Sequence, residues 1–203
     1  MDFDGIISGG VGRDGIPHLD RPQFETVEEA TSMMNYVEPV VTFKINGESR
    51  AYPLAILTWH EVVNDVVGGV PVTVTFCPLC NSGLAFERTL EGRVFDFGVS
   101  GNLRNSDLVM WDRQTQTWWQ QLTGEAIVGE LAGHQLPFIS ASIVSWADFK
   151  AANPDGWCSH ETPASTGLTA ATPTASMTGP TVCRSYLMEK KTIVCCPRKW
   201  SRP

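Results

Sequence analysis

The sequence predicts a strand-dominated α+β domain over residues 1–156, in which several antiparallel hairpins form a sheet or a partly closed barrel with two or three short helices. Short runs rich in β-branched residues recur along the chain, and turn signals separate them, of which Asn46-Gly47 is the strongest. Helical patterns are few and short. Hydrophobic residues make up 42% of the 203 residues, which is enough apolar material for a core.

The first half of the domain is expected to combine a hairpin with two helices. Thr26 is suited to cap a short helix that runs to about residue 34, because acidic residues follow it in the first turn. Residues 39–52 are expected to form the hairpin around Asn46-Gly47. A second helix is predicted over residues 54–67, because Pro53 precedes it and two glycines follow it.

The second half is expected to consist mainly of strands. A β-branched strand leads directly to Cys77, and a final helix begins after the capping residue Ser145. The predicted elements are a strand at 71–76, hairpins at 83–99 and 108–121, a further strand within 124–136, and a helix at 145–152.

Charge and composition exclude some classes of function. The formal net charge of -7 and the pI of about 5.0 argue against a nucleic-acid partner, which requires a basic face. No stretch reaches the roughly 18 consecutive apolar residues of a membrane-spanning helix, so no span is expected. The acidic start, Met1-Asp2-Phe3-Asp4-Gly5, lacks the features of a signal peptide, and the localisation stays open.

The chemistry of the sequence is concentrated in the motif Cys77-Pro78-Leu79-Cys80. Two thiolates at this spacing can point at one centre, where they hold a soft metal ion or form a reducible disulfide. A structural zinc site needs four ligands, usually from two such motifs, and the predicted domain contains only one. His60 and Met110 are the best further ligands, and such a set suits copper better than structural zinc. We therefore predict a copper or zinc site formed by Cys77, Cys80, His60 and Met110.

Polar residues near these positions in the sequence are predicted to contact a ligand or to orient the metal ligands. If residues 54–67 are helical, His60 and Asn64 share one face of the helix, and Glu61 and Asp65 share the next. Glu61 can then orient the His60 imidazole. The predicted set is Glu61, Asn64, Asp65, Ser100, Asn102, Asp112 and Arg113.

Other interpretations of the motif remain open. A strand that leads into C-x-x-C also occurs in thiol–disulfide oxidoreductases, although the alternating βαβ pattern of thioredoxin-like folds is missing. A module that binds a small molecule is a second alternative, with the loop around Asn102 and the Trp-rich hairpin as its walls. Two buried cysteines can also be ordinary core residues. Asp107 is best explained as a turn-forming residue.

Several motifs resemble the family known as domain of unknown function number 3179, from bacteria and archaea. The similar stretches are Asp14-Gly15-Ile16-Pro17, Ala51-Tyr52-Pro53-Leu54, Trp59-His60-Glu61-Val62-Val63-Asn64-Asp65, Val74-Thr75-Phe76-Cys77-Pro78-Leu79-Cys80, Phe97-Gly98-Val99-Ser100-Gly101-Asn102-Leu103 and Met110-Trp111-Asp112-Arg113, followed by residues 115–120. They cover about residues 5–156. Phe76 and Trp111 stand where the family has Tyr, so neither position supplies an essential phenol. The resemblance implies that the predicted site residues belong to a signature, and it implies no established activity. Relatives often carry an export signal or a membrane anchor.

The composition changes after residue 156. Residues 161–181 are almost entirely Thr, Ala, Ser, Pro and Gly, which bury too little to offset the entropy of ordering. Family members look rich in Tyr, Asn, Arg and Asp here, and nucleotides that encode residues 167–174 can read Ala-Tyr-Gly-Arg-Asn-Pro-Tyr in another frame. Residues 157–203 are therefore predicted to be a low-complexity tail, disordered or translated out of frame. The cysteines of this tail, Cys158, Cys183, Cys195 and Cys196, are then expected to carry no function.

Overall fold

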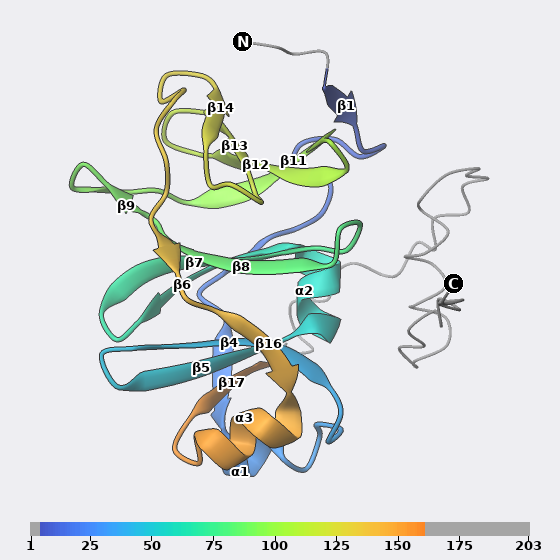
Figure 1. Ribbon diagram of the computed structural model, residues 1–203, viewed down its shortest axis with the longest axis vertical. Helices are drawn as coiled ribbons and strands as arrows, with labels where there is room; N and C mark the ends of the chain where they lie inside the picture. Colours follow the sequence, from blue (N-terminus) through green and yellow to red (C-terminus); the bar gives the residue numbers. More distant parts are fainter. Residues whose placement is uncertain (1–4, 161–203) are drawn as a thin grey trace, which may run out of the picture. The chain divides into compact units, whose positions relative to one another are not determined.

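The structure is a computed structural model that describes residues 5–160, and strands dominate this part of the chain. Three five-stranded sheets lie one above another, with short helices beside them (Figure 1). This arrangement confirms the predicted strand-dominated α+β class. The prediction about residues 161–203 lies outside the described residues.

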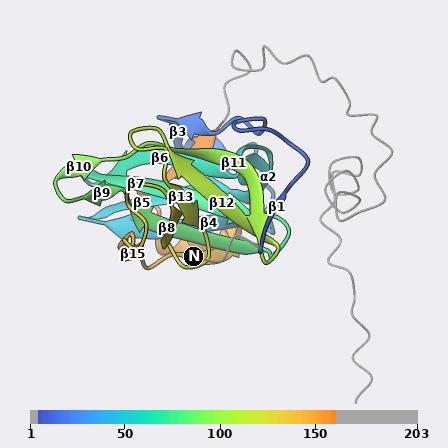
Figure 2. The ribbon, with the colours of Figure 1, turned by 90° about the horizontal axis from the view of Figure 1, so that it is seen from above.

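Sheet A is the uppermost sheet in Figure 1, and Figure 2 looks down on it. All of its strand pairs are antiparallel, and the pairing of β11 with β12 contains a bulge between Val99 and Asn102. Its order is β1 (Ile6–Ser8), β11 (Phe97–Arg104), β12 (Asp107–Asp112), β13 (Trp118–Gln120) and β14 (Ala126–Val128).

Sheet B forms the middle layer. In its long hairpin β7–β8, Cys77 is the last residue of β7 and pairs with Ser82, the first residue of β8. Cys80 lies in the turn between them, over residues 78–81. The order is β15 (Phe138–Ile139), β8 (Ser82–Glu87), β7 (Val70–Cys77), β6 (Val62–Val67) and β2 (Leu19–Asp20). A separate two-stranded ribbon of β9 (Thr89–Leu90) and β10 (Arg93–Val94) follows β8 along the chain.

Sheet C carries helices on its outer face. Its order is β16 (Ser142–Ser145), β4 (Pro39–Ile45), β5 (Glu48–Pro53), β17 (Trp157–His160) and β3 (Gln23–Thr26), with α1 (Val27–Ala30) and α3 (Trp146–Ala152) beside it. Thr26 and Ser145 cap α1 and α3, as the sequence predicts. The strand β17 begins one residue after the predicted end of the domain, and it pairs with both β3 and β5.

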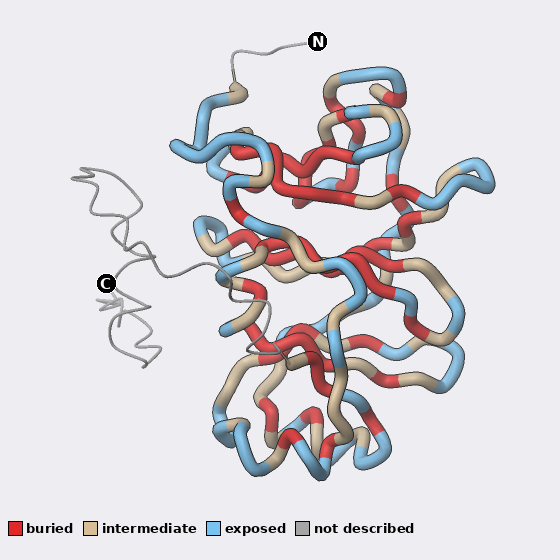
Figure 3. Tube along the Cα trace, turned by 180° about the vertical axis from the view of Figure 1, so that it is seen from behind, coloured by how far each residue is buried: buried red, intermediate tan, exposed pale blue. Residues whose placement is uncertain are grey.

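Two apolar cores hold the layers together, and Figure 3 shows the buried residues concentrated in the strands. Successive residues of β6 point to opposite faces, so Val62 belongs to the core between sheets A and B, and Val63 to the core between sheets B and C. In the same way Cys77 joins the first core and Phe76 joins the second. Because both faces of sheet B are covered, most residues of β6 and β7 are buried, the polar ones included.

The predicted helix over residues 54–67 is wrong in its second half. The helix α2 (Leu54–His60) ends at Glu61, whose backbone adopts a left-handed φ of 58°. Two pairs of valines follow, and this β-branched run forms β6 against β7. Consequently His60 and Asn64 do not share a helix face.

Candidate metal centre

Two loops from different sheets bring three potential metal ligands together. The sulfur atoms of Cys77 and Cys80 and a carboxylate oxygen of Asp107 all lie within 4.8 Å of one another. Cys77 ends β7 in sheet B, and Cys80 lies in the following turn. Asp107 begins β12 in sheet A, directly after the turn from β11. The centre therefore lies where the β7–β8 hairpin of sheet B and the β11–β12 hairpin of sheet A bring their turns together.

The turn before Asp107 has the backbone of a tight hairpin. Arg104 pairs with Asp107, and the intervening residues Asn105 and Ser106 have φ values of 53° and 64°. A two-residue hairpin loop of this kind requires positive φ at both central positions. The carbonyl of Ser106 also accepts a weak hydrogen bond from the Cys77 thiol at 3.9 Å. This turn therefore holds the backbone before Asp107 against the sulfur of Cys77.

The Asp107 carboxylate is oriented by the protein. Its side chain is buried, with the residue 3% exposed. One oxygen, Oδ2, accepts a hydrogen bond from the backbone N–H of Leu122 at 2.9 Å and another from the Gln120 side-chain amide. The other oxygen, Oδ1, accepts a hydrogen bond from the thiol of Cys80, with the sulfur 3.4 Å away. Hydrogen bonds to one oxygen of a carboxylate are a common way of presenting the other oxygen to a metal ion.

The distance between the sulfur and the oxygen fits a shared tetrahedral ion. Zinc binds sulfur at about 2.3 Å and carboxylate oxygen at about 2.0 Å, so a tetrahedral angle separates the two donors by about 3.5 Å. The measured distance from Cys80 Sγ to Asp107 Oδ1 is 3.4 Å. The fold therefore sets these two donors at the separation that a tetrahedral ion requires.

A row of polar groups lies behind Cys80. The hydroxyl of Ser82 is 3.0 Å from the Cys80 sulfur and donates to the side-chain oxygen of Gln121 at 2.9 Å. The Gln121 amide nitrogen donates to the hydroxyl of Thr75 at 3.0 Å, which fixes its orientation. Because Gln121 and Thr75 are buried, this row gives Ser82 a defined position beside the sulfur.

Burial decides the protonation state of Cys77. The residue is 1% exposed, and burial raises the pKa of its thiol to about 12. At neutral pH Cys77 is therefore a thiol, which is a poor nucleophile and not yet a metal ligand. A bound metal ion reverses this balance, because a coordinating thiol loses its proton. The raised pKa argues against Cys77 as the attacking thiol of an oxidoreductase.

Comparison with known proteins agrees with the resemblance seen in the sequence. The profile of the family described as protein of unknown function DUF3179 matches residues 13–166. The chain belongs to this family. No curated protein and no solved structure matches the chain significantly. Within residues 5–160 of this DUF3179 protein, no helix has the length and apolar character needed to cross a membrane.

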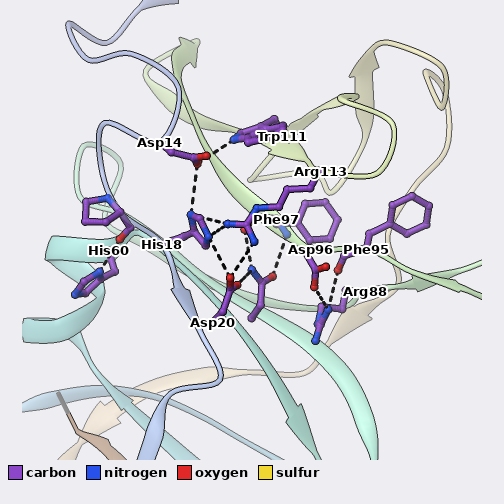
Figure 4. Close-up of polar contacts among 12 residues, drawn as sticks. Asp14, His18, Asp20, His60, Arg88, Phe95, Asp96, Phe97, Trp111 and Arg113 are labelled. Atoms are coloured by element: carbon purple, nitrogen blue, oxygen red, sulfur yellow. Dashed lines mark hydrogen bonds and ion pairs between the residues drawn. The ribbon is translucent and has the colours of Figure 1, made fainter. Parts of the chain in front are cut away.

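The two other predicted ligands lie on elements that do not carry the group of three or at another position of β12. His60 ends α2 and is not a member of that group, and its Nδ1 lies 2.5 Å from the carbonyl oxygen of Pro17 (Figure 4). Met110 is fully buried in the core between sheets A and B, to which Cys77 also belongs. Metal ligation by His60 and Met110 stays a prediction.

The predicted residue Arg113 belongs to a different polar network, which holds the N-terminal strap (residues 9–18) against β11 (Figure 4). Trp111 Nε1 donates to Asp14 Oδ1 at 3.1 Å, and that oxygen lies 3.4 Å from His18 Nδ1. Arg113 donates to His18 Nε2 and, at 2.9 Å, to Asp20 Oδ2. Since Nε2 is an acceptor, the proton of a neutral His18 lies on Nδ1 and faces Asp14. Burial, followed by the charge of Arg113, lowers the pKa of His18 and favours this neutral form.

Asn64 extends the same network into the stacked sheets. Its side-chain nitrogen donates to Asp20 Oδ1 at 2.9 Å and to the carbonyl of Phe97 at 2.8 Å, and its oxygen accepts from the Phe97 N–H at 3.1 Å. The strap also depends on Gly98, because a Cβ atom there would collide with the Asp14 carboxylate and the Trp111 indole nitrogen. The signature residues Asp14, Gly98, Trp111 and Arg113 therefore have a structural role, because they hold the strap on β11 or leave room for it.

The remaining predicted residues have structural roles within the domain, mostly through hydrogen bonds to other residues of the protein. Asp112 accepts bonds from Thr115 and Trp119 and thereby closes the β12–β13 hairpin. The hydroxyl of Ser100 donates to Val109 at 2.5 Å and accepts from the N–H of Asn102 at 3.1 Å, which stabilises the β11 bulge. Asp65 accepts from the Tyr52 hydroxyl at 2.7 Å, and Glu61 ends α2. Contact of these residues with a ligand stays a prediction.

One cavity in the described part of the chain bears on the predicted small-molecule module. This cavity of about 290 Å³ lies along β1, β11 and β14, next to the Trp-rich hairpin, because its lining residues Ala126 and Val128 pair with Trp119 and Trp118. Neither Asn102 nor a tryptophan lines it, and contact of these residues with a small molecule stays a prediction. Its walls are Ile6, Arg104, Glu125, Ala126, Ile127, Val128, Ala132 and Gly133. None of the three candidate metal ligands lines it.

Sequence reasoning missed the residues that complete the centre. It assigned Asp107 to turn chemistry, whereas the structure brings its carboxylate to the two sulfurs. Ser82, Gln120 and Gln121 carried no separate signal. The one available signal was an acidic residue at the start of a predicted strand, and the same pattern marks ordinary turns.

Proposed function

We propose that this DUF3179 domain binds a zinc ion through the thiolates of Cys77 and Cys80 and the carboxylate of Asp107. The observation that carries the proposal is the separation of 3.4 Å between Cys80 Sγ and Asp107 Oδ1, which fits a tetrahedral ion between them. The second sulfur lies within the same 4.8 Å group. No activity is assigned to the ion by this proposal.

The ligand types favour zinc over copper. Two thiolates suit both Zn(II) and Cu(I), but a carboxylate is a hard ligand that Cu(I) binds poorly. Zinc accepts sulfur and carboxylate oxygen in one site. Because the oxygen of Asp107 faces the sulfur of Cys80, the mixed donor set supports Zn(II).

Metal titration of the full chain tests the proposal. Cys183, Cys195 and Cys196 are first replaced by Ser, so that these thiols do not contribute. The protein is then titrated with Co(II), whose absorption reports thiolate and tetrahedral ligation, and Zn(II) is used to displace it. We expect one equivalent to bind, with a sulfur-to-cobalt band that Cys77→Ser and Cys80→Ser each weaken.

The same titration has a matched control variant and an outcome that would contradict the proposed zinc site. Cys158→Ser serves as the matched control, because this cysteine is also buried but lies in β17 of sheet C. Its replacement should leave the cobalt spectrum unchanged. Absence of any bound Co(II) or Zn(II), or a spectrum that survives both Cys77→Ser and Cys80→Ser, would refute the proposed function.

A further inference from the structure

The three ligands differ sharply in their access to solvent. Cys77 and Asp107 are buried, 1% and 3% exposed, whereas Cys80 is exposed. Cys77 is fixed in a strand, and Asp107 is fixed by two hydrogen bonds to Oδ2. Cys80 instead lies in a turn, next to Asn81 with its left-handed φ of 53°. An ion held by this set is therefore buried on one side and accessible beside Cys80.

Within residues 5–160, three side chains of the types His, Cys, Asp and Glu form this group, and a tetrahedral ion held by these three alone keeps one open position. Structural zinc sites are closed by four protein ligands, which this set does not provide. A catalytic site with an open position normally has an acid or base close to it. Leu79, Asn81 and Ser106, which adjoin the ligands in the sequence, and Leu122, which donates to Asp107, are exposed and carry no titratable group.

We infer that this centre exchanges its zinc ion with a partner that carries a thiolate or another soft donor, so that the ion is cargo and not a permanent component. The inference rests on the metal-binding function proposed above. A donor of the partner enters the open position beside Cys80 and forms a bond to zinc, and the bond between zinc and Cys80 then breaks. Further donors of the partner replace Asp107 and Cys77 in the same way, so that the ion leaves with the partner. Each released cysteine thiolate takes up a proton from water. No electron is transferred.

The surface around the open position fits such an encounter. Leu79 and Leu122 are 43% and 52% exposed, and Leu122 also donates its backbone N–H to Asp107. These two residues and the exposed Asn81 and Ser106 carry no charge, although the whole chain has a net charge of -7. An uncharged rim lets an anionic thiolate approach without the repulsion that an acidic surface would cause.

The concentration dependence of zinc transfer tests the inference. The zinc-loaded full chain is mixed with increasing amounts of the anionic chelator 4-(2-pyridylazo)resorcinol, and the transfer rate is followed by absorbance. Exchange through the open position predicts a rate that rises in proportion to the chelator concentration. A rate independent of chelator concentration means that the ion leaves before the chelator binds, and it would overturn the inference while leaving zinc binding intact.

A pair of charge variants tests the side of entry. Leu79→Lys and Leu79→Glu are compared with the anionic chelator and with a neutral pyridyl chelator at low salt. For each variant, the rate with the anionic chelator is divided by the rate with the neutral chelator, so that any change in zinc affinity cancels. We expect this ratio to be at least about threefold higher for the Lys variant than for the Glu variant.

The control for charge is the same pair of substitutions at Phe138, an exposed residue on β15. These variants should give equal ratios. Equal ratios for the two Leu79 variants would mean that the chelator does not enter beside Cys80, and would refute the inference. A protein that binds no zinc at all would refute the proposed function itself, and with it this inference.

Discussion

Replacement of Asp107 by Asn separates metal ligation from folding. Asn has the same shape, and its amide oxygen can accept the bonds from Leu122 and Gln120 that now reach Oδ2. The amide NH₂ then occupies the place of Oδ1, 3.4 Å from the sulfur of Cys80. An amide nitrogen has no lone pair for a metal ion, so Asp107→Asn should remove one ligand. The metal-free stability should fall by no more than about 1–2 kcal/mol, because the two hydrogen bonds to the buried side chain remain but no longer involve a charged acceptor.

The expected loss of zinc affinity can be bounded from below. Removal of a group that only orients a ligand costs about 10–100-fold in metal affinity. Loss of the ligand itself should cost at least about 100-fold, or about 2.7 kcal/mol. At a zinc concentration of about 100 times the parent Kd, the parent gains about 2.7 kcal/mol, whereas the Asn variant gains about 0.4 kcal/mol. For a domain of this size, these values correspond to a rise in Tm of about 5–11 °C for the parent and about 1–2 °C for the variant.

Thermal unfolding with and without Zn(II) measures both quantities in one experiment. Asp155→Asn is the matched control, because Asp155 is an exposed carboxylate that belongs to no ligand group. It should keep the full zinc-dependent rise in Tm. If Asp107→Asn also keeps the full rise, Asp107 does not bind the ion, and the reasoning from the distance between sulfur and oxygen is refuted.

Three further predictions follow from burial and from close packing. Iodoacetamide at pH 8 should alkylate Cys80 at least about tenfold faster than Cys77, because burial raises the pKa of the Cys77 thiol to about 12; peptide mass spectrometry gives both rates, and equal rates would contradict this. Burial also raises the pKa of Asp65, so stability that its protonated form contributes in acid is lost as the pH rises. Asp65→Asn should therefore increase the free energy of unfolding, measured by urea denaturation, more at pH 7 than at pH 4. An equal effect at both pH values would count against this prediction. Gly98→Ala should cost about 1–3 kcal/mol, because the strap carboxylate and an indole occupy the space of the new methyl group; Gly12→Ala, which meets no atom within 4 Å, should be nearly neutral, and equal unfolding free energies for the two variants would show that the strap adapts.

Local signals in the sequence were sufficient for most of the fold. The Asn46-Gly47 turn joins β4 to β5, and Thr26 and Ser145 cap their helices, because each signal acts within a few residues of itself. The failure at residues 62–67 has a physical cause. A helical continuation of α2 and a β-strand compete for residues 62–67, and the pairing of β6 with β7 selects the strand. That pairing depends on tertiary structure, which a local pattern does not contain.

Only the part of the candidate centre that is close together in the sequence could be predicted. The spacing of Cys77 and Cys80 identifies them as candidate ligands in the sequence, but Asp107 joins them only when sheet A lies against sheet B. Asn64 and Arg113 are polar signature residues that form hydrogen bonds within the protein, Asn64 to Asp20 and Phe97 and Arg113 to Asp20 and His18. Contact of either residue with a ligand stays a prediction. Sequence patterns cannot distinguish a polar group that is bonded within the protein from one that faces a ligand.

The separation of the ligands along the chain couples zinc binding to the native state. Cys77 and Cys80 can meet an ion in the unfolded chain, but Asp107 lies 27 residues beyond Cys80 and must be brought back through a loop. Closing a loop of this length costs about 3 kcal/mol beyond the constant term of loop closure. The folded protein has already met this cost, because the turn at residues 105–106 and the bonds to Oδ2 hold the carboxylate in place. An ion that uses all three ligands should therefore prefer the folded domain by roughly 100-fold over the C-x-x-C motif with a free carboxylate, and binding should stabilise the contact between sheets A and B.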